Sequence, residues 1–282
     1  MLIYALMFML RLVPVRLLGA LGAGLGRLAY LFDRRHRQIV LSNLDRIYPE
    51  RDEAWKIRIA HESFAELGRT SFELPHVYLR SKAFLLSRIE LCNPELLDAA
   101  KAANQGVILA ACHHSNWELG GLSLSMLGHT TDVIYRPIRQ PSLDHFIRNA
   151  RSRFGAIFHP REAGLRWIPR ALKQNHLIAV MVDQHLSNGT PVPFLGHAAL
   201  TTTMPALFTN KYRTPVVSVI LHRIGRGFRF RLEFLPVTID SGDELQTMEA
   251  IGNSFAPAIH ARPELWLWLH RRWLYLDEQE QA

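Results

Sequence analysis

The sequence predicts one α/β domain, with a mainly parallel central sheet flanked by helices and an N-terminal helix that associates with a membrane. Three observations lead to this expectation. Of the 282 residues, 48% are apolar and 21% are charged, too apolar for a disordered chain and too charged for a polytopic membrane protein. From residue 106 onward, short apolar runs alternate with helical patterns. The most lipid-like segment is residues 1–31.

Residues 1–31 form an apolar segment that Arg11, Pro14 and Arg16 interrupt. The uninterrupted part is shorter than the roughly 18 apolar residues that a spanning helix needs, and no positive charge precedes it as in a signal peptide. We therefore expect a membrane-anchored or interfacial helix, followed by a single domain over residues 32–282. The alternative is an amphipathic helix that packs on the protein's own core.

Two helical features precede the sheet. Gly22 and Gly26 lie four residues apart, a spacing that lets a second helix approach closely. Apolar residues recur at helical spacing over residues 50–80, and we expect Pro75 to stop this helix.

The strands are predicted from runs of apolar and β-branched residues, namely 107–112, 131–137, 177–183, 215–223 and 228–236. Helical patterns lie between or beside them, at 116–127, 142–153, 163–174 and 203–212. Continuous apolar strands that alternate with helices are typical of a parallel sheet covered on both faces. In the last run, 228–236, apolar and polar residues alternate instead. We therefore expect an antiparallel edge strand there, with Arg229 and Arg231 facing water.

Charge and cysteine content narrow the function classes. The net charge of +8 and the pI near 9.9 favour anionic partners such as a phosphorylated lipid, a membrane surface or nucleic acid. No nucleic-acid-binding motif is visible, so we do not expect nucleic acid as the partner. Cys92 and Cys112 are too few for a disulfide framework or a four-thiolate zinc site, which favours a reducing compartment.

The strongest candidate for chemistry follows the first predicted core strand, in the sequence VILAACHHSNWELGG at 107–121. His113 stands at the strand's end, where ligands bind in open α/β sheets, and Glu118 stands in the first turn of the next helix. Glu118 could fold back, accept the imidazole N–H and make the other nitrogen a better base. Because the chain has no G-x-S-x-G nucleophile elbow, that base would deprotonate a substrate hydroxyl for direct group transfer.

Other interpretations of this pattern remain open. The two histidines could be a surface pair that caps a helix. His113, His114 and Glu118 could also bind a metal, but neither H-E-x-x-H nor H-x-x-E-H occurs, so we expect no metal. Cys112 is most simply a small core residue at the strand's end.

The spacing H-x-x-x-x-E, in the setting HHSNWE, resembles the catalytic block of the glycerolipid acyltransferase superfamily, and specifically of the bacterial lipid A biosynthesis acyltransferases. At His185 and at TTTMP, 201–205, the sequence departs from the family pattern, so the resemblance implies the reaction class but neither the acyl chain length nor the acceptor. The resemblance continues in order through RRHRQIVLSNLDRIYPE at 34–50, VIYRP at 133–137, SLDHFIRNARSRFG at 142–155, VDQ at 182–184, VPFLG at 192–196 and PELWLWLHRRW at 263–273.

The resemblance implies roles for individual residues. It implies that His113 is the general base and Glu118 its orienting carboxylate, that Arg151 is the arginine near the site, with Arg153 as the rival, and that Asp183 is a further acidic position.

Basic residues cluster around these positions. Residues 136–176 hold nine Lys or Arg against two acidic residues, a local charge of +7 that suits a phosphorylated head group or the acidic surface of an acyl carrier protein. Arg136 is either a head-group clamp or a surface charge at a strand end. Trp266, Trp268 and Trp273 are expected to pack the core or to sit at the interface.

The resemblance further implies an O-acyltransferase that moves a fatty acyl chain from an acyl-carrier-protein thioester to a hydroxyl of a lipid A precursor. Such an enzyme needs no cofactor, binds an anionic glycolipid and works at the cytoplasmic face of the bacterial inner membrane. The alternatives are a lysophospholipid or another glycolipid as acceptor, coenzyme A as donor, and a non-catalytic lipid-binding protein.

Overall fold

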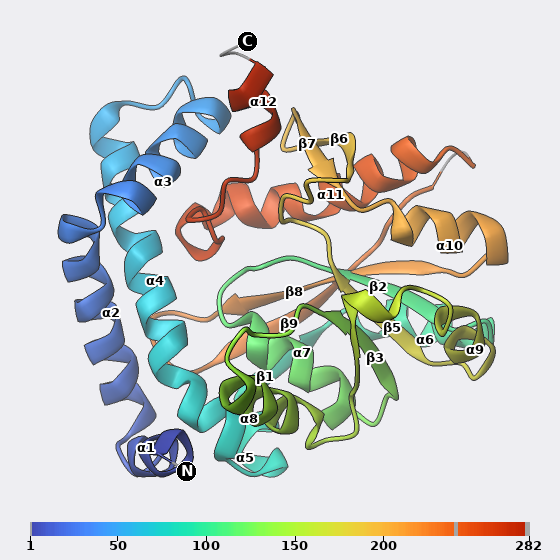
Figure 1. Cartoon of the computed structure of the whole chain (residues 1–282), viewed down its shortest axis with the longest axis horizontal. Helices are drawn as coiled ribbons and strands as arrows, with labels where there is room; N and C mark the ends of the chain where they lie inside the picture. The colour runs from blue at the N-terminus through green and yellow to red at the C-terminus, as the bar shows by residue number, and fades with distance from the viewer. Residues whose placement is uncertain (1, 240–241, 280–282) are drawn as a thin grey trace.

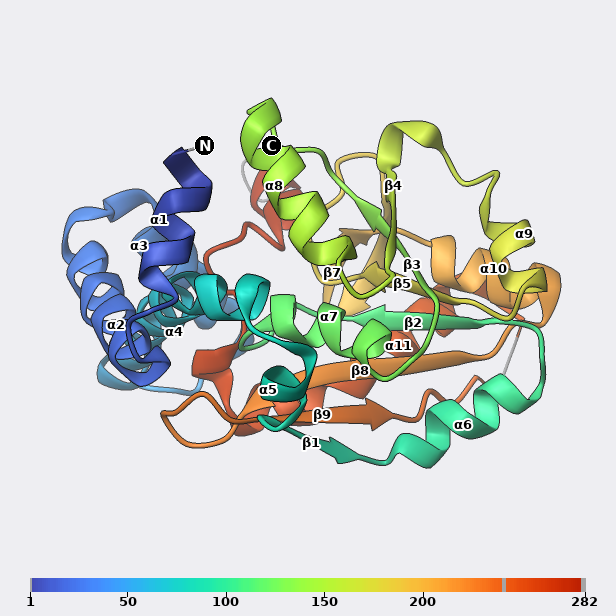
Figure 2. The same ribbon diagram turned by 90° about the horizontal axis from the view of Figure 1, so that it is seen from below.

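The computed structural model describes residues 2–239 and 242–279, and its centre is a seven-stranded sheet of order β1-β9-β8-β2-β5-β3-β4 (Figures 1 and 2). The predicted mainly parallel sheet is confirmed, because five neighbouring strands run in the same direction and β9 is antiparallel to β8. The strands of this sheet are β1 (Ile89–Cys92), β2 (Val107–Ala111), β3 (Thr131–Tyr135), β4 (Ile157–Pro160), β5 (Leu177–Met181), β8 (Val216–Arg223) and β9 (Phe230–Leu235).

The predicted position of the last strand is wrong in one respect. β9 is antiparallel, and Arg229 and Arg231 are exposed, but β1 pairs outside β9 and forms the edge. Arg229 reaches across to Glu90 of β1, at 2.7 Å. With four residues, β1 is too short to show a strand pattern in the sequence.

Helices cover both faces of the sheet. One buried cluster includes residues of α6 (Pro94–Ala102), α7 (Trp117–Met126) and α8 (Pro141–Ser152). The cluster on the other face includes residues of α9 (Ile168–Lys173), α10 (Met204–Tyr212) and α11 (Glu244–Ala261). The shorter elements include α5 (Lys82–Leu86), the hairpin of β6 (Thr190–Phe194) and β7 (His197–Thr201), and α12 (Leu274–Gln279).

Two predicted helix boundaries are wrong. α9 is shorter than the predicted 163–174, because Gly164 adopts φ +67° between a 3-10 turn and the helix. α4 (Glu53–Leu79) continues through Pro75 for one more turn. Val77 and Tyr78 in that turn are buried, and their packing compensates for the backbone hydrogen bond that proline cannot donate.

The N-terminal segment forms two helices, α1 (Leu2–Leu10) and α2 (Val15–Phe32), with Pro14 between them. α2 runs beside α4 at one end of the sheet (Figure 1), and α3 (Arg34–Ile47) follows it. A Cβ at Gly22 would come within 2.4 Å of the Gly68 carbonyl oxygen, and one at Gly26 within 2.1 Å of the Phe64 oxygen. The expected close helix contact at these glycines is therefore present.

The other face of α2 is apolar and open. By length and composition, α2 could cross a membrane, although about a third of its residues are buried in the protein. The exposed fractions of Leu17, Leu21, Leu25 and Leu28 are 50%, 50%, 50% and 48%. These leucines form one stripe along the helix, opposite the stripe that packs on α4.

Candidate active site

The candidate site lies at the carboxyl edge of two neighbouring parallel strands. β2 ends just before His113, and β5 ends just before Asp183, so the register Ala111 to Met181 brings the two side chains together. The Nδ1–H of His113 donates to Oδ1 of Asp183 at 2.8 Å. The backbone N–H of His113 donates to the other oxygen, Oδ2, at 2.7 Å. The sequence predicted that Asp183 belongs to the site but not that it pairs with His113.

Glu118 has different partners from those expected. Oε2 accepts hydrogen bonds from Nε of Arg151 and from the hydroxyl of Tyr78, each at 2.8 Å, and Oε1 accepts from Nη2 of Arg151. The prediction that Glu118 accepts the imidazole N–H of His113 is thus corrected, since Asp183 occupies that position. An arginine fork matches a carboxylate better than one imidazole N–H does, and α8 brings that fork to Glu118.

Both carboxylates are ionised at neutral pH. Burial raises the pKa of Asp183, but the imidazolium form of His113 and hydrogen bonds from His113 and Trp266 lower it more, so the pKa lies below its usual range. Burial likewise raises the pKa of Glu118, and Arg151 and Tyr78 lower it more. An ionised Asp183 keeps the proton of neutral His113 on Nδ1, which leaves a lone pair on Nε2.

Nε2 of His113 lies on the more open side of the site. It is 3.3 Å from the side-chain nitrogen of Gln184, which is an exposed residue. The His113 side chain is 13% exposed, and its ring contacts Trp117 edge to face. A substrate hydroxyl that binds Nε2 would therefore take the place of the exposed Gln184 amide.

His114 is a core residue, so the interpretation of the two histidines as a surface pair is wrong. It is fully buried and donates from Nδ1 to the Leu221 carbonyl at 2.9 Å. Burial lowers the pKa of His114 to about 3, so it is neutral. Within the described residues, no group of three His, Cys, Asp or Glu side chains could hold a metal ion.

Arg151 and Arg153, the two candidates for the arginine near the site, have different partners. Arg151 contacts Glu118, whereas Nη2 of Arg153 donates to the Val77 carbonyl at 3.0 Å and its guanidinium lies over Phe154. Burial lowers the pKa of Arg153 to about 10, so it stays charged near neutral pH. Arg136 is exposed just after β3, at the same edge of the sheet as His113 and Asp183.

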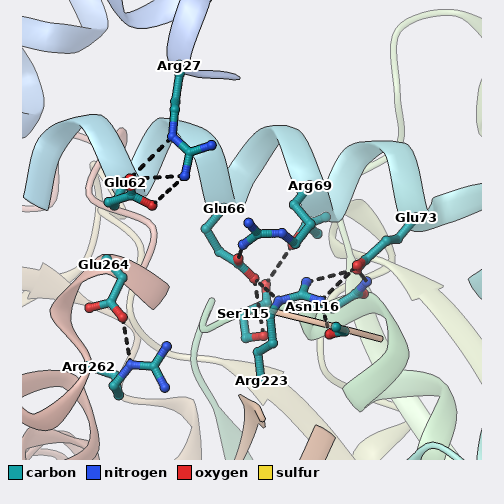
Figure 3. Close-up of polar contacts among 12 residues, drawn as sticks. Arg27, Glu62, Glu66, Arg69, Glu73, Ser115, Asn116, Arg223, Arg262 and Glu264 are labelled. Atoms are coloured by element: carbon teal, nitrogen blue, oxygen red, sulfur yellow. Dashed lines mark hydrogen bonds and ion pairs between the residues drawn. The ribbon is translucent and has the colours of Figure 1, made fainter. Parts of the chain in front are cut away.

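A buried ionic network that includes Asn116, three residues after His113, was not predicted from the sequence (Figure 3). Arg223, at the end of β8, donates to Glu66 at 2.6 Å and to both oxygens of Glu73 at 2.8 Å. Asn116 donates to Glu73 at 2.9 Å and caps α7 through the N–H of Leu119. The network therefore joins α4 and β8 to the start of the helix that follows His113. The signal in the sequence is the seven-residue spacing of Glu66 and Glu73, which puts both on one helix face.

Two aromatic residues at the site were also missed. Tyr78 binds Glu118, and Nε1–H of Trp266 donates to Oδ2 of Asp183 at 2.8 Å. The expectation that the C-terminal tryptophans pack the core is confirmed, because Trp266, Trp268 and Trp273 are at most 2% exposed.

Known proteins resemble this chain over most of its length. The sequence profile of the family "Bacterial lipid A biosynthesis acyltransferase" matches residues 1–275. The chain is 24% identical to a lipid A biosynthesis acyltransferase of Haemophilus influenzae, over 93% of this chain and 83% of the relative. It is 26% identical to the lipid A biosynthesis lauroyltransferase of Escherichia coli, over 92% and 86%.

A relative with a different name matches as well. The chain is 27% identical to a phosphatidylinositol mannoside acyltransferase of Mycobacterium tuberculosis, over 78% of this chain and 71% of the relative. The profile covers nearly the whole chain, and the relatives share the acyltransferase name. The chain is therefore an acyltransferase and belongs to the bacterial lipid A biosynthesis acyltransferase family.

Proposed function

We propose that this protein transfers a fatty acyl chain from an acyl-carrier-protein thioester to a hydroxyl of a lipid A precursor, in lipopolysaccharide biosynthesis. The observation that carries the proposal is the pair of His113 and Asp183, bonded through Nδ1 at 2.8 Å with Nε2 toward the more open side. Arg151 beside it provides positive charge for an anionic substrate.

The pair suits a one-step acyl transfer. Nε2 of His113 takes the proton of the acceptor hydroxyl while that oxygen attacks the thioester carbonyl carbon. The tetrahedral intermediate collapses: the C–S bond breaks, the ester C–O bond remains, and the imidazolium returns its proton to the leaving thiolate. The Asp183 carboxylate holds the imidazole and stabilises its transient positive charge.

In this proposal Glu118 positions Arg151 and does not touch His113. Glu118 binds Nε and Nη2 of Arg151, and 27% of the arginine side chain stays exposed. A guanidinium held in this way can bind a phosphate or carboxylate of the substrate with a fixed orientation. Arg136, exposed at the same edge of the sheet, suits a second contact with the head group.

A second acceptor class has specific support. The mycobacterial relative is named a phosphatidylinositol mannoside acyltransferase, so a mannosylated phospholipid is the alternative acceptor. Both acceptors offer sugar hydroxyls beside phosphate groups, and the same His113 and Arg151 could serve either.

The protein is proposed to act on the cytoplasmic face of a bacterial inner membrane. The open leucine stripe of α2 supports contact with lipid, and Arg34 and Arg35 are exposed directly after it, where anionic head groups would lie.

The test is an assay of the purified full-length chain with acyl-loaded carrier protein or acyl coenzyme A as donor. A lipid A precursor and a phosphatidylinositol mannoside serve as acceptors, and mass spectrometry detects the product. We expect one acceptor to gain the mass of one acyl chain, and to gain none with His113→Ala. Product formation by His113→Ala at the wild-type rate would refute the proposed base.

A further inference from the structure

The C-terminal segment Leu265–Arg272 contacts both strand ends that form the candidate site. The backbone N–H of Leu267 donates to the carbonyl of His113 at 3.0 Å. The N–H of Ser115 donates to the carbonyl of Leu265 at 2.7 Å. These bonds flank an isolated β-bridge between His114 and Trp266, so the segment fixes the backbone that carries the base.

The same segment fixes the backbone around Asp183. Arg272 is fully buried, and its Nη1 donates to the carbonyl of Gln184 at 2.9 Å. Its Nη2 lies 3.5 Å from the carbonyl oxygen of Val182. Arg272 therefore contacts the residues on both sides of the carboxylate.

Trp266 fixes the Asp183 side chain itself. Its Nε1–H donates to Oδ2 at 2.8 Å, and the backbone N–H of His113 donates to the same oxygen. With Oδ2 held by two donors, Oδ1 is the oxygen that faces Nδ1 of His113. Both Trp266 and Asp183 are 2% exposed, so water does not readily replace the indole N–H.

We propose that Trp266 is a positioning residue for acyl transfer, which acts by holding the carboxylate of Asp183 in the orientation that His113 needs. The inference rests on the proposed function, because it requires His113 to be the base. Other titratable groups face this pair as well: Arg272, His270, His114 and Cys112 act on Asp183, and Glu118 acts on His113. Trp266 does not titrate, so its replacement changes the hydrogen bonding of the carboxylate and removes no charge.

The chain offers a matched control. Trp268 lies in the same aromatic cluster, 4.6 Å from Trp266 between ring centroids, and its Nε1–H donates to the carbonyl of Pro263 at 2.6 Å. Trp266→Phe and Trp268→Phe therefore each remove one indole N–H and the same ring volume. Only the first removes a donor to Asp183.

The test is the pH dependence of kcat and kcat/KM for both variants. For Trp266→Phe we expect kcat to fall about 10-fold or more, the size of effect seen when a residue that orients a metal ligand is lost, with KM little changed. The acid limb should move to higher pH, because a carboxylate with one donor fewer stabilises the imidazolium of His113 more strongly. Trp268→Phe should keep the wild-type acid limb. An unmoved acid limb in Trp266→Phe, or the same loss in both variants, would overturn the inference.

A second replacement covers the case in which Trp266→Phe does not fold. β-(3-Benzothienyl)alanine at position 266 keeps the bicyclic ring and substitutes sulfur for N–H. The low-field proton signal of His113 Nδ1–H should shift in this protein, and an unchanged signal would overturn the inference without any turnover measurement. Full activity of both His113→Ala and Asp183→Asn would instead refute the proposed function. If His113→Ala and Asp183→Asn are both inactive but Trp266→Phe and Trp268→Phe have the same kcat and the same pH profile, only the positioning role of Trp266 is refuted.

Discussion

Arg151 binds Glu118 with two of its guanidinium nitrogens, so the acidic residue of the H-x-x-x-x-E spacing pairs with an arginine 33 residues away and leaves the histidine to Asp183. The acid and the histidine of this motif thus belong to two adjacent pairs. In each pair the carboxylate is less exposed, at 1% for Asp183 and 10% for Glu118, than the histidine or arginine that it binds.

Breaking the Arg151 pair should impair substrate binding. Arg151→Ala should raise KM for the anionic substrate or lower kcat well beyond the effect of losing a surface charge, and Arg151→Lys should not restore the wild type, because lysine cannot form the fork. Glu118→Gln should show the same defect in weaker form. Steady-state kinetics with Arg148→Ala, an exposed arginine of the same helix, provides the control. Wild-type kinetics for Arg151→Lys would contradict this role.

The two adjacent histidines should behave differently. His113→Ala should lower kcat about 10²- to 10⁴-fold, because it removes the general base, and it should also lower stability, because the buried Asp183 carboxylate loses its Nδ1–H donor. His114→Ala should destabilise the fold by about 2 kcal/mol or more, because it opens a cavity and leaves the Leu221 carbonyl without its donor. Chemical denaturation and kinetics on both variants distinguish the two effects. Equal kinetic defects with equal stability would show that the base is wrongly assigned.

Asp183 should make stability depend on pH in the acid range. Its pKa in the folded protein is below the ordinary value of 3.8, so its ionised form stabilises the fold above that value. This contribution is lost as the pH falls from about 4 through the lower folded pKa. Unfolding free energies of the wild type and Asp183→Asn should therefore converge as the pH falls below 4. A difference that stays constant from pH 6 to pH 3 would contradict the lowered pKa.

The open face of α2 should carry much of the lipid affinity. Replacing Leu21, Leu25 and Leu28 together by Gln should weaken binding to vesicles that contain anionic phospholipid by about 100-fold, if each half-exposed leucine contributes about 1 kcal/mol. Co-sedimentation with vesicles measures the change. Unchanged sedimentation of the triple variant would exclude this face as the contact.

The control for α2 replaces leucines or isoleucines of similar exposure on other surfaces, namely Leu91, Ile157 and Leu245. Substitution is a cleaner test than deletion of residues 1–31, because deletion would also uncover the face of α4 that packs against Gly22 and Gly26.

The sheet was predictable because its central strands are continuous apolar runs, as in 177–183, which no amphipathic helix resembles. β1 and β4 could not be predicted, since a strand of four residues is too short to show a pattern of apolar residues. For the site, the sequence predicted that a residue lies at the end of a strand, but it did not predict which side chain that residue binds. His113 and Asp183 each follow an apolar strand, but their contact depends on β2 and β5 being neighbours, which the order of strands along the chain does not reveal. The sequence does not distinguish Trp266 from a tryptophan that only packs the core, because the difference is the partner of its indole N–H, which is Asp183.

The close packing of α2 on α4 also has a consequence for where catalysis takes place. α4 contacts α2 through backbone atoms on one side, and on another it holds Asn116 and Arg223 through Glu73. A helix bound so tightly on two sides leaves no hinge between the leucine stripe and the strand end that carries His113. If that stripe rests in lipid, the reactive nitrogen stays at one fixed height above the bilayer. Only acceptors whose hydroxyl projects to that height would then be acylated, so the depth of the hydroxyl becomes part of substrate selection.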